Sequence, residues 1–248
     1  MNKLSIVSCG LMSSSQMTLE SLAALRGCGA VYSNSVDPVS ARAILALGIP
    51  LLGGQKRSYP RLFKDVLAAL KKHSRVGLLI YGNPFFLNSQ LADLLSAAAR
   101  LAEVEVLPGI SSFDALVNMF GMSALSGKGL FIADLNFFMK KPEFSPGPDI
   151  FFFAPFRLNA AENAKFKARF IKALAGKYPG DYPVYLVKCN PDLARAEMLK
   201  GSVSALPALL KRCDNQHTLV IFSEERLKTL KTPPAWLSFK ELDLSRGA

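Results

Sequence analysis

The sequence has few of the residues that build metal centres or disulfide frameworks, and it has no long apolar run. Its 248 residues include two histidines, and its four cysteines form no Cys-x-x-Cys pair. Because a structural zinc site needs four close ligands, we expect no metal site and free buried thiols instead. No run of about 18 apolar residues occurs, so no transmembrane helix is predicted. The first residues do not read as a signal peptide, and we expect a cytoplasmic protein.

Nucleotide-binding and hydrolytic motifs are missing as well. No Gly-x-x-x-x-Gly-Lys-Ser/Thr is present, which excludes a P-loop, and the turn at Ser8–Met12 does not read Gly-x-Gly-x-x-Gly. The sequence lacks Gly-x-Ser-x-Gly, and two histidines leave little room for a hydrolase triad. Asp114 and Asp134 could form the carboxylate pair of a glycosidase, but Asp114 has capping-box spacing with Ser111.

The sequence has fewer acidic than basic residues. It contains 19 aspartates and glutamates and 30 lysines and arginines, which gives a formal net charge of +11. A basic surface attracts anions, whether nucleic acid, acidic lipid or an acidic substrate. The chain has no zinc finger, RNA-recognition motif or basic zipper, and we expect neither nucleic acid nor a membrane as a partner. Two segments are richer in basic residues, and the second is predicted to be the solvated face of a helix. These are Lys56, Arg57, Arg61 and Lys64, and then Lys165, Lys167, Arg169 and Lys172.

The first half of the chain alternates strand-like and helix-like segments. Short apolar runs predict strands, and apolar residues three and four apart predict helices. We expect strands at 4–7, 30–32, 76–81 and 104–107, and helices at 18–26, 60–72 and 89–100. This alternation is typical of a parallel sheet with helices on its faces.

The second half has a different pattern, after a glycine- and serine-rich break at 121–129. We expect strands at 130–135, 150–153, 184–187 and 218–222, and helices at 160–175 and 204–212. Since fewer helices separate the first of these strands, we expect a mixed sheet. The predicted fold is α/β with two lobes and a cleft between them. Its parts are a parallel-sheet lobe at 1–122, a mixed-sheet lobe at 123–227 and a loose tail at 228–248.

Two of the predicted strands end in glycine-containing loops of uncharged residues. Tyr81-Gly82-Asn83-Pro84 follows the third strand, and Pro108-Gly109-Ile110-Ser111-Ser112 follows the fourth. Open α/β sheets bind ligands at the carboxyl ends of their strands, and glycine lets the backbone approach a ligand closely. Each loop alone is equally well explained as an ordinary turn. Together they suit a ligand with a nucleoside at one end and a cation in the middle.

In their order and spacing these loops resemble those of the tetrapyrrole (corrin/porphyrin) methylase family of S-adenosylmethionine-dependent methyltransferases. The resemblance covers roughly residues 3–222 and rests on the segments LSIVSCGLMSSSQMTLESLAAL, LLIYGNPFFLNSQL and VEVLPGISSFDAL. It implies two α/β lobes, a homodimer, and S-adenosylmethionine bound in the interlobe cleft and released as S-adenosylhomocysteine. The first turn departs from the family's Gly-x-Gly-Pro-Gly-Asp, and Asn83 replaces the aspartate of the second motif.

Further segments resemble the borosin branch of this family, which N-methylates peptide backbones. Tyr81 precedes Gly82 as in that branch's Tyr-Gly-His-Pro, and Tyr59 lies 22 residues before Tyr81. KRSYPRLFKDVLAAL, KYPGDYPVYLVKCNPDLARAEMLKGSVSALPALL and QHTLVIF resemble its helix and second-lobe segments. Two departures weigh against the branch: Gln55 takes the place of its arginine, and the short, charged tail contains no obvious peptide to methylate in cis.

The resemblance implies a methyltransferase that N-methylates backbone amides of a separate peptide, in the biosynthesis of a ribosomally made and modified peptide (RiPP). Two alternatives stay open. One is C- or O-methylation of a tetrapyrrole or another small acceptor. The other is a catalytically silent module that binds S-adenosylmethionine or a peptide.

An amide nitrogen must lose its proton before it attacks a methyl group, so a base is needed. Tyr59 or Tyr81 could be the base if a cation lowers its pKa, and Arg57 or Arg61 is the candidate cation. Our hypothesis assigns the acceptor's proton to Tyr59. Tyr81 is expected to orient the cofactor or to close the site. His217 is either a cofactor contact or a surface histidine. The cofactor contacts carried over by motif are Tyr81, Asn83, Phe86, Leu87, Ser111, Ser112, Ala154, Leu186, His217 and Thr218.

Overall fold

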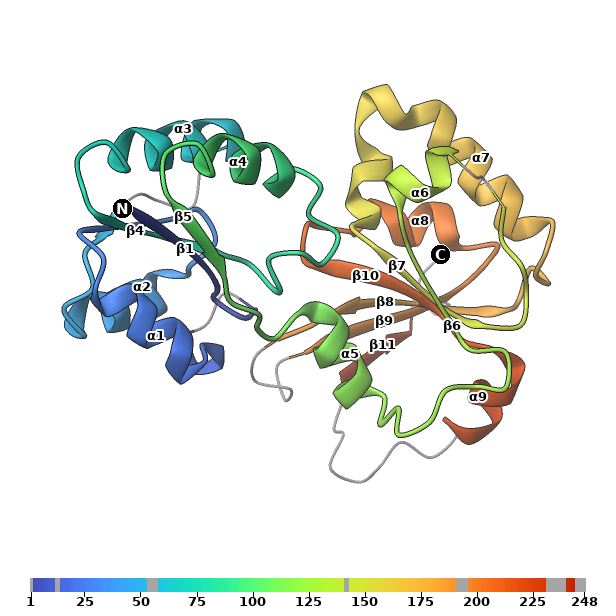
Figure 1. Ribbon diagram of the computed structural model, residues 1–248. Helices are drawn as coiled ribbons and strands as arrows, with labels where there is room; N and C mark the ends of the chain where they lie inside the picture. Colours follow the sequence, from blue (N-terminus) through green and yellow to red (C-terminus); the bar gives the residue numbers. More distant parts are fainter. Residues whose placement is uncertain are drawn as a thin grey trace. The chain divides into compact units, whose positions relative to one another are not determined.

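The computed structural model describes residues 2–11, 14–52, 58–140, 143–190, 196–230 and 240–243 (Figure 1). The chain forms two units, Met1–Ala115 and Leu116–Ala248, each with its own sheet and hydrophobic core. The boundary lies within helix α5 (Ser112–Met119), upstream of the glycine- and serine-rich break. The predicted fold class, with one parallel and one mixed sheet, is confirmed.

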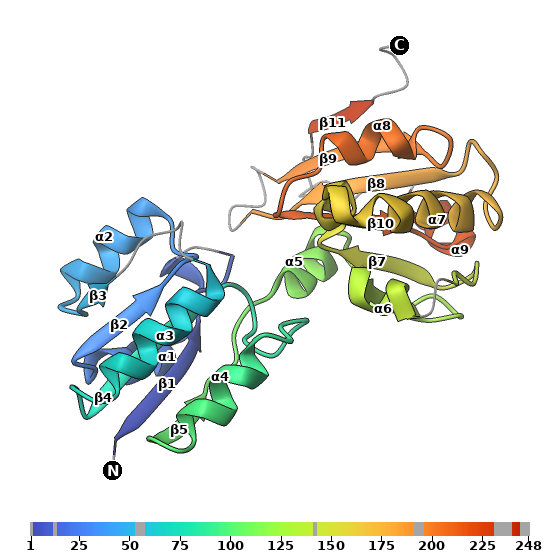
Figure 2. The same ribbon diagram turned by 90° about the horizontal axis from the view of Figure 1, so that it is seen from above.

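The first unit is built on a five-stranded parallel sheet in the order β3-β2-β4-β1-β5. In Figure 2 the strands β3 and β5 lie at its two sides. The strands are β1 (Lys3–Ser8), β2 (Ala30–Ser33), β3 (Leu51–Leu52), β4 (Arg75–Ile80) and β5 (Glu103–Val106). The helices are α1 (Leu19–Arg26), α2 (Pro38–Ala46), α3 (Tyr59–Ala69) and α4 (Leu91–Ala98), with a 3-10 turn at Ser14–Gln16. The helices α1 and α2 cover one face of the sheet, and α3 and α4 cover the other (Figure 1).

Strands β1 and β4 are neighbours, but the chain leaves them in opposite directions. From β1 it passes through α1 to β2, and from β4 it passes through α4 to β5, on the other side of β1. Such a reversal of strand order is the position at which open α/β sheets bind ligands, outside the carboxyl ends of the strands. The topology therefore points to the ends of β1 and β4 as the place to look for a site.

The second unit is built on a six-stranded mixed sheet in the order β11-β9-β8-β10-β7-β6. The pairs β6–β7 and β9–β11 are parallel, and the other pairs are antiparallel. The strands are β6 (Leu130–Asp134), β7 (Asp149–Phe153), β8 (Pro183–Lys188), β9 (Glu197–Ser202), β10 (His217–Ile221) and β11 (Lys240–Asp243). Besides α5, the helices are α6 (Leu135–Lys140), α7 (Ala164–Ala175), α8 (Leu206–Lys211) and α9 (Glu224–Thr229), with 3-10 turns at Pro155–Asn159 and Ala161–Asn163.

Six of these elements are not among those predicted from the sequence, namely α2, β3, α6, β9, α9 and β11. The correction with the widest effect concerns the expected loose tail from residue 228. Residues 240–243 of that segment form β11, which pairs with β9. Residues 240–243 are thus part of the second sheet.

After its first residue, Asp149, strand β7 is apolar because it is buried on both faces of its sheet. Ile150 and Phe152 belong to the core cluster that includes Phe170 of α7, and the Phe152 and Phe170 rings are 4.7 Å apart. Phe151, whose side chain alternates to the opposite face, lies 6.5 Å from the Phe222 ring. Two-sided burial explains why this strand reads as a continuous apolar run and not as an alternating pattern.

A buried polar cluster ties the start of β7 to α9. Asp149 is fully buried, and its Oδ1 accepts hydrogen bonds from the backbone N–H and the hydroxyl of Ser223, both at 2.9 Å. Arg226 donates from Nε to the Asp149 Oδ2 at 3.1 Å and from Nη2 to the Ala124 carbonyl at 2.6 Å. Both carboxylate oxygens are therefore satisfied, as a buried charge requires.

None of the helices that the structure describes has the length and apolar character needed to cross a bilayer. Within the same residues, no group of three or more histidine, cysteine, aspartate or glutamate side chains is placed to hold a metal ion. The four cysteines are free thiols, of which Cys9, Cys28 and Cys189 are buried and Cys213 is half-buried.

Candidate functional site

The loops that follow β1, β4 and β5 are joined to one another at the carboxyl edge of the first sheet. The Cys9 N–H donates to the Ile80 carbonyl at 2.8 Å, and the Gly82 N–H donates to the Gly10 carbonyl at 2.9 Å. On the other side of β1, the Leu107 N–H donates to the Ile6 carbonyl at 2.9 Å. The loops that the sequence singled out separately thus form one surface, at the strand-order reversal.

Two glycines are required for this arrangement, for different reasons. Gly82 has a φ of 65°, in the left-handed region that side chains disfavour. Gly109 lies against Ser8, so that a Cβ added at Gly109 would be 2.2 Å from the Ser8 Cβ and 2.4 Å from its Oγ. The Ser8 Oγ in turn accepts the Gly10 N–H at 2.9 Å. A chain of contacts therefore runs from Gly109 through Ser8 and Gly10 to Gly82.

The loop after β4 offers both apolar surface and a free hydrogen-bond donor. Asn83 makes a tight turn, in which its Oδ1 accepts the Phe85 N–H and its carbonyl accepts the Phe86 N–H, both at 3.0 Å. Its side-chain amide nitrogen has no hydrogen-bond partner within the described residues. Leu87 has a φ of 53° and, like Phe85, is exposed.

The predicted capping box at the start of α5 is present. Ser111 is buried, and both its N–H and its hydroxyl donate to the Asp114 Oδ2, at 2.7 and 2.6 Å. Because its hydroxyl proton is donated to Asp114, the Ser111 hydroxyl can only accept a hydrogen bond from a ligand. Ser112 follows as the first residue of α5, and Phe113 packs its ring 6.1 Å from that of Phe86.

Tyr59 lies close to the end of β1. Burial raises the pKa of its phenol, and the nearby Cys9 raises it further, while a hydrogen bond with Ser35 acts in the opposite direction. No cation among the described residues contributes to the shift. Arg61 is exposed on α3, and Arg57 lies outside the described residues. The direction of the shift is opposite to what a general base at neutral pH needs, so we infer that Tyr59 stays protonated.

We accordingly expect Tyr59→Phe to lower turnover by no more than about tenfold, the effect of losing one neutral hydrogen bond. Steady-state kinetics of methyl transfer would measure this. Abolished turnover with unchanged affinity for S-adenosylmethionine would instead restore Tyr59 as the base. Tyr81 follows β4 and is half-buried, and its role in orienting the cofactor stays a prediction.

Four of the predicted cofactor contacts belong to the second unit. Ala154 follows β7 with a φ of 51°, and Leu186 in β8 has its side chain fully within the hydrophobic core. Leu186 can therefore meet a ligand only through its backbone. His217 and Thr218 open β10, and both are buried, at 5% and 2% exposure. The reading of His217 as a surface histidine is wrong.

His217 is held by a neighbouring carboxylate and has one nitrogen without a partner. Its Nδ1 lies 2.7 Å from the Asp214 Oδ1, and the same carboxylate accepts from Lys188 Nζ at 2.8 Å. Its Nε2 is buried and has no hydrogen-bond partner in the described part of the chain. A buried nitrogen of this kind is a place where a bound molecule could supply the missing partner.

Some residues of the site were not identified from the sequence. Ser8 and Gln16 hold the first loop, where the Gln16 Oε1 accepts the Leu11 N–H at 2.7 Å. Ser33 ties the end of β2 to β4 by donating to the Leu79 carbonyl at 3.2 Å, and Ser35 bonds Tyr59. A serine two residues before a glycine, as in Ser8-Cys9-Gly10, is a local turn signal that could have indicated Ser8.

Comparisons with known proteins agree with this fold. The family model described as Tetrapyrrole (Corrin/Porphyrin) Methylases matches residues 3–188. Among solved structures, a uroporphyrin-III-C-methyltransferase from Thermus thermophilus is similar, with a TM-score of 0.64 and 19% identity over 90% of this chain and 92% of that one. A cobalt precorrin-4 methyltransferase of cobalamin biosynthesis is similar with a TM-score of 0.61 and 16% identity, over 89% and 94% of the two chains. No curated protein matches the sequence significantly.

Proposed function

We propose that this chain, which belongs to the tetrapyrrole (corrin/porphyrin) methylase family and is an S-adenosylmethionine-dependent methyltransferase, methylates a tetrapyrrole. The observation that carries the proposal is the match of the family model over residues 3–188. The two similar structures are named as a uroporphyrin-III-C-methyltransferase and a cobalt precorrin-4 methyltransferase. The peptide acceptor favoured by the sequence has no comparable support, so the tetrapyrrole takes its place as the leading candidate.

The charge of the chain also favours a tetrapyrrole. Biosynthetic tetrapyrroles carry several carboxylates, and a net charge of +11 attracts such a polyanion. A peptide with an apolar core would gain nothing from this field. The basic composition therefore supports the tetrapyrrole as the proposed acceptor.

The residues at the carboxyl edge of the first sheet fit a nucleoside with a cationic centre. The three loops contain no charged residue, and the carboxylate of Asp114, in the first turn of α5, is bonded to Ser111. A ligand there would meet backbone groups, the free amide nitrogen of Asn83, and the apolar side chains of Phe85 and Leu87. S-adenosylmethionine supplies a methyl group on a sulfonium, which is transferred by in-line displacement.

The chain's own part in this reaction is alignment and exclusion of water. The contacts that link the three loops fix their backbone groups before a ligand arrives, which lowers the entropic cost of a productive orientation. Exposed apolar side chains beside these loops would be covered by the acceptor, and water would leave the site. We propose Tyr81, Asn83, Phe86, Leu87, Ser111 and Ser112 as the contacts in the first unit, and Ala154, Leu186, His217 and Thr218 in the second.

Calorimetry and mass spectrometry together test the proposal. S-adenosylmethionine and S-adenosylhomocysteine are first titrated into the full chain. The chain is then incubated with S-adenosylmethionine and either uroporphyrinogen III, a peptide with an apolar tail, or no acceptor. We expect cofactor binding and methyl addition to the tetrapyrrole alone.

The other outcomes are equally informative. Methylation of the peptide alone would overturn the proposal in favour of backbone N-methylation. Binding of cofactor with no methylated product from either acceptor would favour the silent module. Homodimerisation and a cytoplasmic location, which the sequence led us to expect, stay predictions.

A further inference from the structure

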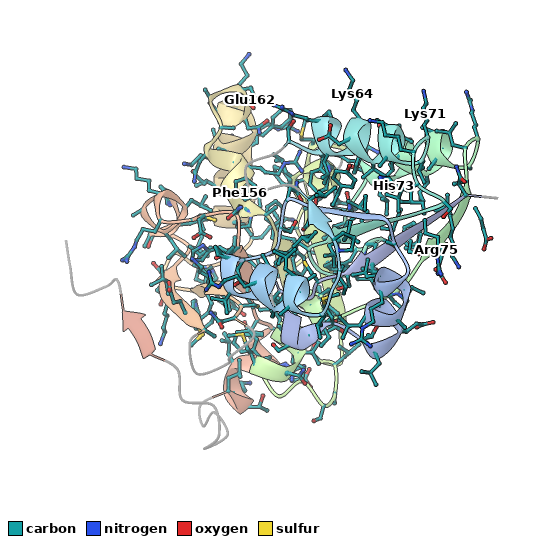
Figure 3. The ribbon with its side chains drawn as sticks, turned by 90° about the vertical axis from the view of Figure 1, so that its left-hand side faces the viewer. Lys64, Lys71, His73, Arg75, Phe156 and Glu162 are labelled. Atoms are coloured by element: carbon teal, nitrogen blue, oxygen red, sulfur yellow. The ribbon has the colours of Figure 1, made fainter. Side chains whose placement is uncertain are left out.

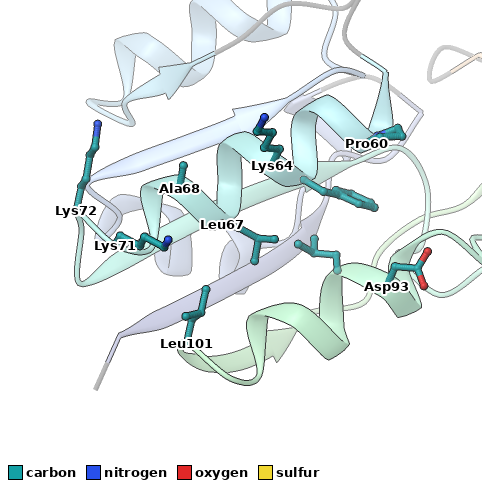
Figure 4. A pocket seen from close by; sticks show the side chains of 10 residues that line it. Pro60, Lys64, Leu67, Ala68, Lys71, Lys72, Asp93 and Leu101 are labelled. Carbon is teal, nitrogen blue, oxygen red and sulfur yellow. The ribbon is translucent and has the colours of Figure 1, made fainter.

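A groove lies on the outer side of α3 and α4, away from the loops described above. It has a volume of about 710 Å³, within the range of small-molecule sites. Its wall along α3 is one helical stripe, and its other wall comes from α4 and the turn that follows (Figure 4). The lining residues on α3 and its end are Pro60, Phe63, Lys64, Leu67, Ala68, Lys71 and Lys72, and the others are Asp93, Leu94 and Leu101.

The floor of the groove is apolar and only partly covered. Phe63 and Leu94 are buried at its base, at 9% and 1% exposure, and both belong to the core of the first unit. Leu67 is half-buried above them, and Leu101 is 41% exposed. Ala68 is small and exposed, and it leaves the space open at the middle of α3. An apolar floor of this kind favours a hydrocarbon ligand, because burying its surface is favourable by about 25 cal/mol per Å².

The charges on the rim are separated along the groove. Figure 4 shows Lys71 and Lys72 towards the end where Leu101 lies, and Asp93 towards the end of Pro60. Lys64 and Lys71 extend outward from the molecule (Figure 3). Within the described residues, none of Lys64, Lys71, Lys72 and Asp93 forms an ion pair. The end with two lysines therefore attracts an anion, and the end with the aspartate repels one.

We propose that this groove binds a small anionic amphiphile, with its head group at Lys71 and Lys72 and its apolar chain along Leu67, Phe63 and Leu94. The stretch of α3 from Pro60 to Ala69 is about 14 Å long at 1.5 Å per residue, and Lys71 lies in the turn beyond it, which leaves room for an extended chain. The ligand is a free small molecule with a carboxylate or similar head. The proposal concerns a site separate from the methyl-transfer site, and it stands or falls independently of the proposed function.

The probe for the test is dodecanoate, at concentrations where it is monomeric. Isothermal titration into the full chain is expected to show one site. The variant Lys71→Glu/Lys72→Glu should weaken binding by about tenfold or more, because two attractions become repulsions. Ala68→Trp should abolish it by filling the middle of the groove. Both changes are at exposed positions, and circular dichroism melts would confirm that the variants fold.

Matched controls separate the groove from general basicity. Lys165→Glu/Lys172→Glu makes the same change of charge on α7 and should leave binding within about twofold of the unmodified chain. Asp93→Asn should also leave it within about twofold, because the head group lies at the other end. A severalfold gain from Asp93→Asn would overturn the proposed orientation. Dodecyltrimethylammonium, with the opposite charge and the same chain, should bind more weakly than dodecanoate.

Three results would overturn the proposal. Dodecanoate binding that is unaffected by both groove variants would place the ligand elsewhere. Binding to phosphatidylglycerol vesicles without binding of free dodecanoate would make the face a membrane contact. A change of oligomeric state in the groove variants, seen by light scattering, would identify a second copy of the chain as the occupant.

Discussion

Replacing Asp149 by alanine is expected to destabilise the second unit by about 3–5 kcal/mol. Asp149 is fully buried and accepts three hydrogen bonds, two from Ser223 and one from Arg226. Alanine would leave the guanidinium of Arg226, whose side chain is 12% exposed, without its carboxylate. It would also leave the buried N–H of Ser223 without an acceptor. Urea unfolding followed by circular dichroism measures the loss.

Two further variants make this expectation specific. Asp181→Ala removes an exposed carboxylate from the same unit and should change stability by less than about 0.5 kcal/mol. Asp149→Ala/Arg226→Met removes both charges and should lose less than the sum of the two single changes, since no charge is left unpaired. Strict additivity would show that the pair is not coupled, and the account of this cluster would fail.

Gly109→Ala is expected to disturb all three loops of the candidate site. Its Cβ would come within 2.2 Å of the Ser8 Cβ, which cannot move without the backbone of β1. Overpacking of this kind costs about 1–3 kcal/mol. If the overpacking destabilises the cofactor-binding conformation of the loops by this amount, the dissociation constant for S-adenosylmethionine rises by about 10- to 100-fold. Calorimetry of the variant against the unmodified chain measures the change.

The contact with Ser8 supplies both a rescue and a control. Ser8→Gly removes the Cβ and the Oγ that the new methyl group would meet, so Gly109→Ala/Ser8→Gly should recover affinity relative to Gly109→Ala alone. Gly180→Ala places a methyl group 3.8 Å from the nearest heavy atom, an ordinary contact, and should have little effect. Equal losses of affinity in Gly109→Ala and in the double variant would contradict the proposed contact chain.

The elements predicted correctly are those whose own residues show the apolar pattern of a helix or a strand. The strand at 76–81 and the helix at 60–72 are apolar where the structure buries them, and both are found, as β4 and α3. By contrast, β9 reads Glu-Met-Leu-Lys-Gly-Ser and is a strand because it pairs with β8 and β11. Such pairing depends on residues distant in the sequence, and no local pattern predicts it.

Helix α2 was missed for a different reason. Its start carries clear signals, since the Asp37 side chain accepts the N–H groups of Val39 and Ser40 and Pro38 occupies the first turn. Its apolar residues, however, do not share one face, and Val39 and Leu45 are exposed. Capping chemistry would have identified this helix where periodicity did not.

For the candidate site, the order of the glycine loops was enough to indicate the edge of the sheet. The sequence could not show that the Ser111 hydroxyl donates a hydrogen bond to Asp114, or that Tyr59 lies beside Cys9. Those facts depend on side-chain orientation and on burial. The hypothesis of a tyrosine base rested on a cation lowering the pKa of Tyr59, and burial shifts that pKa in the other direction.

The contact between Gly109 and Ser8 also constrains the order in which substitutions at these two positions can accumulate during evolution. A lineage that acquired alanine at 109 first would pass through the clash with Ser8, whereas one that first acquired glycine at 8 would lose only the hydrogen bond from the Gly10 N–H to the Ser8 Oγ. The order of the two substitutions is therefore not interchangeable. Descendants in which position 109 is larger are expected to have lost the side chain at position 8 beforehand.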